Sequence, residues 1–232
     1  MSGSEVIDLF GAILPYLKVN DLPGKLINID TLDGAGNSTQ AALLAGYLDR
    51  ILHIQTVLTK EPTDGTYGSL IRKVLKKELT LDKWALQMLF AVDRSDHLDN
   101  QNIRRALTDG AWAVTARYAL STLAFGVSQG IPAWRLLTVN ITYPWPNLNI
   151  ILRLEVDECL RRIEERNRKA GVKSELFEEK ATLERTMEAY EYLSTRLPNI
   201  VFVDGGGDPP QVFERVKAEV HKYLLPRIPP VP

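Results

Sequence analysis

The segment TLDGAGNSTQ, residues 31–40, is the part of the chain from which the fold is best predicted. It follows KLINID, residues 25–30, which is typical of a short buried strand, and it leads into residues 38–51, whose apolar side chains recur at helical spacing. Between a strand and a helix, small residues let backbone N–H groups wrap a phosphate at the positive end of the helix. The segment predicts a phosphate-binding loop, with a tight turn capped by Ser38 as the alternative.

The match to the usual pattern of such loops, G-x-x-x-x-G-K-[ST], is incomplete. Gly36, Ser38 and Thr39 agree with the pattern, whereas Thr31 stands in place of the first glycine and Asn37 in place of the lysine. This segment alone leaves both alternatives open.

Strand and helix patterns alternate along the rest of the chain, which predicts an α/β fold with a parallel sheet covered on both faces. The order is preceded by an amphipathic helix over residues 4–18, interrupted by Pro15, which we expect to dock on the core. The strands are expected at 25–30, 53–59, 111–116, 148–154 and 199–204, and the helices at 38–51, 68–79, 82–107, 118–127, 157–169, 175–196 and 209–224.

Composition narrows the class of protein. The 232 residues suit one domain, the formal net charge of −1 gives no general attraction to nucleic acid or anionic membranes, and the single cysteine fits a reducing cytoplasm. Three scattered histidines make a zinc site improbable, and no apolar run reaches the roughly 20 residues that span a bilayer. We expect an N-terminal helical extension at 1–24, one domain at 25–225 and a proline-rich tail at 226–232.

Four ordered segments extend the evidence: TLDGAGNSTQ, TKEPTDGTYGSLIRKVL (59–75), LFAVDRSDHL (89–98) and ARYALSTLAF (116–125). Together they resemble the thymidylate kinase family, whose motifs run like GLDGAGKSTQ, TREPGGTPLGEKIRELL, LFAADRAQHL and DRYTLSTLAYQ. The resemblance covers about residues 24–221. It implies a three-layer P-loop NTPase fold, a five-stranded parallel sheet flanked by helices, and a homodimer formed through helices beside the acceptor site. The helix from Asp82 offers Trp84, Met88 and Leu89 either to such an interface or to the core.

Members of this family transfer a phosphoryl group from ATP to dTMP with Mg²⁺. The resemblance implies that Asp33 contacts the sugar, Phe90 stacks on the base and Arg94 hydrogen-bonds it, although each alone would be an ordinary turn, core or surface residue. The resemblance implies further contacts to dTMP from Lys60, Arg72, Arg117 and Tyr118. It implies contacts to ATP from Gly34, Ala35, Gly36, Asn37, Ser38 and Thr39, and a contact to Mg²⁺ from Ser38. The residues that it implies for catalysis are Arg117, Asn37, Ser38, Arg166 and Arg168.

Two departures fall where the phosphoryl group is transferred. Asn37 replaces the bridging lysine, and Ala116 replaces the aspartate that the family links to the metal. Replacement of a cation aimed at developing negative charge predicts a rate lower by about 10²–10³-fold. Family members with a glycine-alanine loop take a catalytic arginine from a mobile lid. In this chain the candidates are Arg166, Arg168, Lys169 and Lys173, which are equally well explained as the solvated end of a charged helix.

Three hypotheses follow for the function. The first is a relative that binds dTMP, or another pyrimidine monophosphate since Gly126 replaces a family glutamine, and transfers phosphate weakly or not at all. The second is a slow dTMP kinase that relies on lid cations. The third is a non-catalytic dimer with a regulatory or scaffolding task.

Overall fold

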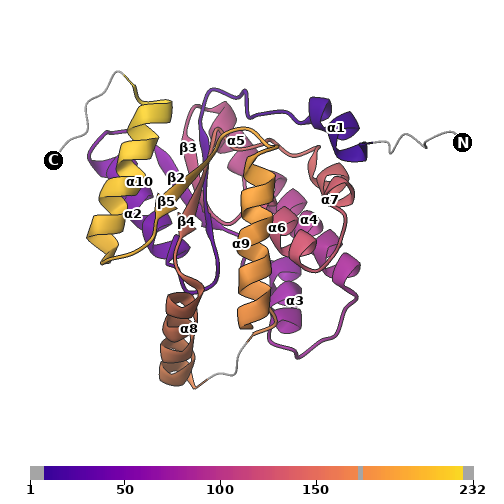
Figure 1. Ribbon diagram of the computed structural model, residues 1–232. Coiled ribbons are helices and arrows are strands. Elements are labelled where there is room, and N and C mark those ends of the chain that lie inside the picture. Colours follow the sequence, from indigo (N-terminus) through magenta and orange to yellow (C-terminus); the bar gives the residue numbers. More distant parts are fainter. Residues whose placement is uncertain (1–7, 172–174, 227–232) are drawn as a thin grey trace, which may run out of the picture.

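The structure is a computed structural model that describes residues 8–171 and 175–226 (Figure 1). A five-stranded, all-parallel sheet runs through it in the order β2-β3-β1-β4-β5, which confirms the expected fold class. The strands are β1 (Leu26–Thr31), β2 (Thr56–Lys60), β3 (Trp112–Ala116), β4 (Leu148–Arg153) and β5 (Ile200–Asp204).

Helices cover both faces of the sheet, as the alternating pattern requires. On one face α2 (Asn37–Arg50) and α10 (Pro209–Leu224) pack on apolar strand residues, and on the other face α6 (Ala119–Ser128) and α9 (Lys180–Ser194) lie side by side (Figure 1). Every residue of β1 and β3 is buried, because both faces of these central strands are covered. The remaining helices are α3 (Thr66–Leu75), α4 (Lys83–Asp99), α5 (Ile103–Thr108), α7 (Ala133–Asn140) and α8 (Val156–Ala170).

Two helical regions differ from the prediction. The single helix expected over 82–107 is divided into α4 and α5, because Asn102 adopts a left-handed conformation with φ 62°. No element is predicted from the sequence for residues 128–147, yet the eight-residue α7 begins there directly after Pro132. Both differences matter below, since α4 supplies side chains to a cavity and Asn140 of α7 hydrogen-bonds one of them, Arg94.

The described part of the N-terminal segment packs against the body of the protein. Helix α1 (Leu9–Ile13) contacts α7 through a buried Phe10, and a 3-10 helix η1 (Leu14–Tyr16) follows where Pro15 interrupts the pattern. Val19 then forms a bridge with Trp145. The expected docking on the core is confirmed, although the helix is shorter than predicted from the spacing.

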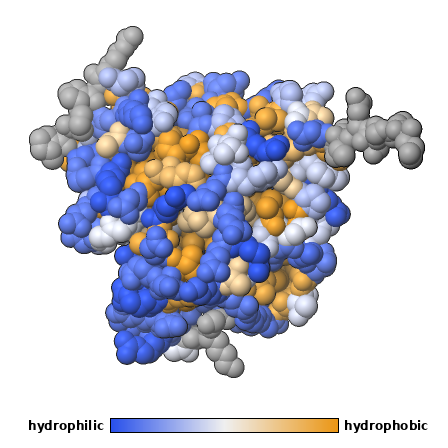
Figure 2. Space-filling model, viewed as in Figure 1, coloured by the Kyte–Doolittle hydropathy of each residue, from blue (hydrophilic) through white to orange (hydrophobic). Residues whose placement is uncertain are grey.

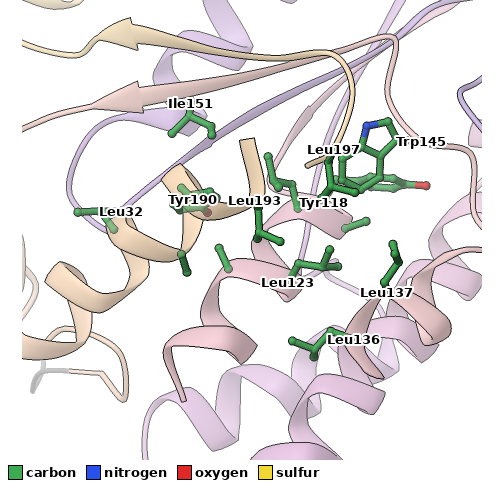
Figure 3. Close-up of a cluster of buried hydrophobic side chains, with 14 of the residues drawn as sticks. Leu32, Tyr118, Leu123, Leu136, Leu137, Trp145, Ile151, Tyr190, Leu193 and Leu197 are labelled. Carbon is green, nitrogen blue, oxygen red and sulfur yellow. The ribbon is translucent and has the colours of Figure 1, made fainter. Parts of the chain in front are cut away.

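The larger core cluster lies between the sheet and α6, α7 and α9, where Tyr118, Trp145 and Leu197 meet (Figure 3). The surface over α8, by contrast, is largely hydrophilic (Figure 2), since this helix is rich in arginine and glutamate. Among the helices in the described ranges, none combines the length and apolarity that crossing a membrane would need.

Candidate active site

The loop between β1 and α2 has the geometry of an anion-binding turn. Gly36 occupies the N-cap of α2 with φ 93° and ψ 23°, and the helix begins at Asn37. Gly34 has φ 86°, and a Cβ there would lie 2.6 Å from the Cys159 carbonyl oxygen of α8. Since the N-cap is Gly36 and no side chain caps this end of α2, the alternative of a turn capped by Ser38 is wrong.

The side chain of Asn37 occupies part of this anion site. Its Oδ1 accepts a hydrogen bond from the Ser38 backbone N–H at 2.9 Å. That N–H is one of the first-turn donors which the helix itself leaves unsatisfied and which a phosphate would use. Where a lysine would supply a positive charge, the chain therefore supplies an uncharged amide that presents an acceptor oxygen to one of the loop's own donors.

Arg117 lies at the carboxyl end of the central strands, where parallel strands commonly place ligands. It follows β3 in the left-handed region, with φ 71°. Its Nη2 donates to Asp33 Oδ1 at 2.5 Å, and its Nη1 donates to the Thr31 carbonyl at 3.0 Å. Burial lowers the pKa of Arg117, but its electrostatic interactions with Asp33, Tyr190 and Asp30 and its hydrogen bond to Asp33 outweigh burial, so the pKa lies above its usual value.

A cavity with about 530 Å³ of empty space, partly open to solvent, lies beside this arginine. Its apolar wall includes Phe125 and Phe177, whose ring centroids are 5.0 Å apart. Five residues that the family resemblance assigns to dTMP line this one cavity, although they come from three separate motifs: Asp33, Phe90, Arg94, Arg117 and Tyr118.

Arg94 is fully buried and its guanidinium is held by several neighbours. Nη2 donates to Glu61 Oε2 at 2.6 Å and to Thr122 Oγ1 at 3.0 Å, and Nη1 donates to the Asn140 side chain of α7. The other oxygen of Glu61 lies 3.1 Å from His97 Nδ1. A buried charge needs a partner and hydrogen bonds; this network supplies the carboxylate and bonds both terminal nitrogens of Arg94, but not its Nε.

Three polar atoms on cavity-lining side chains have no hydrogen-bond partner among the described residues: Gln87 Oε1, Arg94 Nε and the Tyr118 hydroxyl. Burial raises the pKa of Tyr118 well above its usual value, so the hydroxyl stays protonated. Buried polar groups are normally paired, and unpaired ones at a cavity mark places where a ligand can complete the bonding.

Lys60 and Arg72 lie outside this lining. Arg72 Nη1 donates to the Pro62 carbonyl at 3.1 Å, and Lys60 pairs with Asp64 at 3.1 Å. Lys60 instead lines a second hollow together with Ser38 and Ala116.

Ala116 brings only a buried methyl group to this second hollow. Within residues 8–171 and 175–226, no group of three or more histidine, cysteine or carboxylate side chains is arranged to hold a metal ion. The metal contact predicted in the loop is the Ser38 hydroxyl, and Ser38 is exposed.

The candidate lid cations differ in their contacts. Arg166 pairs with the buried carboxylate of Glu178, and Lys169 pairs with Glu165 at 2.7 Å. Arg168 is exposed and makes no ion pair with any residue of the described ranges, whereas Lys173 lies outside them. Of the two arginines predicted to act in catalysis, Arg168 is therefore the one without a competing carboxylate.

Glu175, which follows α8, also lines the cavity beside Arg117. Burial raises its pKa, and the nearby negative charges of Glu178 and Asp33 raise it further. This residue was not predicted from the sequence.

The replacement at Gly126 affects packing rather than the cavity wall. A Cβ at this position of α6 would lie 2.6 Å from both Cδ atoms of Leu136 in α7, and Gly126 is not among the residues that line the cavity. Thr31 likewise turns away from the loop, since its hydroxyl donates to the Leu152 carbonyl of β4 at 2.9 Å.

Comparisons with known proteins agree with this geometry. Residues 29–216 match the family described as thymidylate kinase. A probable thymidylate kinase of Pyrococcus horikoshii is 33% identical over 208 residues, which cover 87% of this chain and 98% of the relative. One of Thermococcus onnurineus is 34% identical over 210 residues, which cover 87% of this chain and 99% of the relative.

A solved structure supports the same assignment. The thymidylate kinase of Candida albicans superimposes with a TM-score of 0.67 at 25% identity, covering 86% of this chain and 92% of that one. The five-stranded parallel sheet flanked by helices is the P-loop NTPase fold expected from the motifs. The chain belongs to the thymidylate kinase family.

Proposed function

We propose that the chain binds dTMP in the cavity beside Arg117 and transfers a phosphoryl group to it slowly or not at all. The main support for dTMP binding is that one cavity is lined by Asp33, Phe90, Arg94, Arg117 and Tyr118. A mostly apolar pocket with a few convergent polar groups is the usual form of a small-molecule site.

Four residues of the lining, together with Arg72 outside it, have chemical tasks in this proposal. Phe90 stacks on the base, Arg94 hydrogen-bonds it, and Asp33 accepts from a sugar hydroxyl. Arg117 and Arg72 hold the acceptor phosphate, which requires Arg117 to exchange part of its contact with Asp33 for the phosphate. A bidentate guanidinium suits a phosphate better than a lysine ammonium does.

We expect phosphoryl transfer to be weakened by the residues at two positions, Asn37 and Ala116. Asn37 offers no charge, and its Oδ1 occupies the Ser38 N–H that a nucleotide phosphate would need. A missing transition-state cation costs about 10²–10³ in rate. Since the replacement at Ala116 removes a second contribution at the same centre, we expect turnover far below the roughly 1–100 per second of ordinary kinases.

ATP and Mg²⁺ fit the loop only in part. The backbone of Gly34 to Gly36 and the hydroxyls of Ser38 and Thr39 suit a triphosphate, and Ser38 is the side chain that would hold Mg²⁺. With alanine at position 116, water and the nucleotide's own phosphates would have to complete the coordination. When bound, the ion would neutralise phosphate charge.

The second candidate function is a slow but active kinase, and it is favoured by an arginine, Arg168, that has no ion pair within the described ranges. This arginine is exposed, so it is available to approach the transferring phosphate from the lid. Arg166 would first have to leave the buried Glu178.

A dimer of this chain in the cytoplasm belongs to the same proposal. Met88 and Val92 are 38% and 40% exposed and lie four residues apart on α4, where apolar side chains form one face. Trp84 is instead covered by Arg135, 3.9 Å from its ring centroid, and Leu89 packs into the core, so neither leads the interface. Sedimentation at micromolar concentration tests this, because a monomer would exclude the third hypothesis of a scaffolding dimer.

Calorimetry with dTMP tests the binding proposal directly. The chain should bind dTMP, and Phe90→Ala should weaken the affinity by about ten- to a hundredfold, because a stacked aromatic ring contributes about 1–3 kcal/mol. Tyr223→Ala removes an aromatic ring that is 48% exposed on α10 and absent from the cavity lining, so it is the matched control and should bind as the unaltered chain does. Absence of heat from dTMP would overturn the proposal.

A further inference from the structure

Gln87 is a buried amide in the cavity that the family resemblance does not explain. It is 1% exposed, lines the cavity with Phe90 and Arg94, and lies on α4. Its Nε2 donates to Gln129 Oε1 at 3.2 Å, while its Oε1 has no partner among the described residues. A buried carbonyl oxygen without a donor costs about 1–3 kcal/mol, which a ligand can recover.

The position of Gln87 on the helix places it beside the stacking ring. Gln87, Phe90 and Arg94 are spaced by three and four residues, so they lie on one face of α4. Along the helix axis Gln87 is about 4.5 Å before Phe90, and Arg94 is about 6 Å after it. A base stacked on Phe90 is therefore flanked by an amide acceptor and a guanidinium donor from the same helix.

The orientation of the Gln87 amide is set by its neighbour. Gln129 is the C-cap residue of α6, and its carbonyl accepts from Lys83 Nζ at 2.7 Å, which ties this segment to the start of α4. Because the amide nitrogen of Gln87 is used by Gln129, the oxygen is the atom left for a ligand. Arg94 has the complementary unpaired donor, Nε.

We propose that Gln87 is a specificity-determining residue, whose Oε1 accepts the N3–H of a thymine or uracil ring while Arg94 donates to O4. This inference rests on the proposed dTMP site and extends it to the choice of base. An imide edge presents an acceptor and a donor side by side, which matches the unpaired atoms of Arg94 and Gln87. Cytosine presents an amine at position 4 and an acceptor at position 3, so it mismatches both. A site built to pair a ligand N–H rejects an analogue that lacks it.

The test uses calorimetry of the full chain with dTMP, dCMP and N3-methyl-dTMP. Gln87→Met keeps the length of the side chain and removes the acceptor. We expect this variant to bind dTMP about tenfold more weakly, as for one lost hydrogen bond, and to bind dCMP unchanged. Gln55→Met, the same change at an exposed position before β2, is the control and should leave both affinities as they were.

The stability of the ligand-free variant separates a binding role from a structural one. Gln87→Met removes an unpaired buried acceptor but also the hydrogen bond to Gln129, two opposing effects, so its thermal midpoint should stay close to that of the unaltered chain while its dTMP affinity falls. An equal dTMP affinity in Gln87→Met would overturn the inference and leave the proposed function standing. Failure of the unaltered chain to bind dTMP would overturn both.

The modified ligand keeps the inference testable if the variant does not fold. The unaltered chain should bind N3-methyl-dTMP at least tenfold more weakly than dTMP, because the donor is gone. Equal affinities would show that no protein acceptor faces N3. Tighter binding of dCMP than dTMP would mean that the Gln87 amide presents its nitrogen to the ligand, which also overturns the inference.

Discussion

The cavity beside Arg117 and the loop between β1 and α2 lie at the same edge of the sheet but differ in what they present to a ligand. In the cavity, polar side chains are held by hydrogen bonds yet keep some atoms unpaired. Arg94, for example, donates to Glu61 and Asn140, while its Nε has no partner among the described residues. In the loop, the backbone geometry is intact, but Asn37 turns its oxygen onto the loop's own donor. In the proposed function, dTMP binding and phosphoryl transfer therefore depend on largely different residues, with Arg117 shared, so transfer can weaken while binding persists.

The largest expected effect concerns the support beneath the cavity. Glu61→Ala leaves the buried Arg94 without its carboxylate, and removal of one partner of a buried pair costs about 3–5 kcal/mol. Denaturant unfolding measures this loss. Asp109→Ala, which breaks the exposed pair with Arg105 at 3.8 Å, is the control and should change stability by no more than about 1 kcal/mol. Similar losses in both variants would show that the buried network does not support the cavity.

The next effect concerns repair of the loop. Asn37→Lys combined with Ala116→Asp should raise ADP formation from ATP and dTMP by about 10²–10³-fold, far more than either change alone, because both groups act on one transition state. Asn37→Ala separates two effects of Asn37, the missing positive charge and the occupied Ser38 N–H. It releases this N–H without adding charge, so it should strengthen ADP binding but leave turnover low. Additive or absent gains in the double variant would indicate that other machinery is missing.

A smaller effect is expected behind the cavity, at the α6–α7 contact. Gly126→Ala forces a Cβ against Leu136 and should destabilise the chain by about 1–3 kcal/mol, the usual cost of overpacking. Gly46→Ala in α2 is the matched helical control, because its Cβ would meet only the flexible end of Arg50 at 3.3 Å. It should be neutral or stabilise by up to about 1 kcal/mol. Thermal unfolding of the two variants measures this difference, and equal midpoints would contradict the predicted overpacking at Gly126.

The smallest effect is the pH dependence at Glu175. Burial raises the pKa of this carboxyl, so the folded state holds the proton more firmly than the unfolded state does. Its contribution is absent at low pH and becomes unfavourable as pH rises from about 4.3, the usual glutamate pKa, through the raised value. Since the side chain is partly exposed, Glu175→Gln should gain no more than about half a kcal/mol at pH 7. An equal difference at pH 3 and pH 7 would contradict this.

Much of the fold and part of the site could be predicted because their signals are local. The five strands follow from runs of apolar residues, and the loop follows from Gly34 and Gly36 between a strand and a helix. The support of Arg94 by Asn140 could not be predicted, because it joins residues 46 positions apart through α7, which carries no marked periodicity. The contact between Asn37 and Ser38 is local, yet it depends on a side-chain rotamer that sequence patterns do not specify.

The central claim is that dTMP binding is retained while phosphoryl transfer is impaired, and one paired measurement tests it. On a single preparation, calorimetry gives dTMP binding, and a coupled assay gives ADP formation with ATP, dTMP and Mg²⁺. We expect saturable dTMP binding together with turnover at least about 10²-fold below the 1–100 per second of ordinary kinases. Turnover within that ordinary range, or no binding of dTMP, would contradict the account.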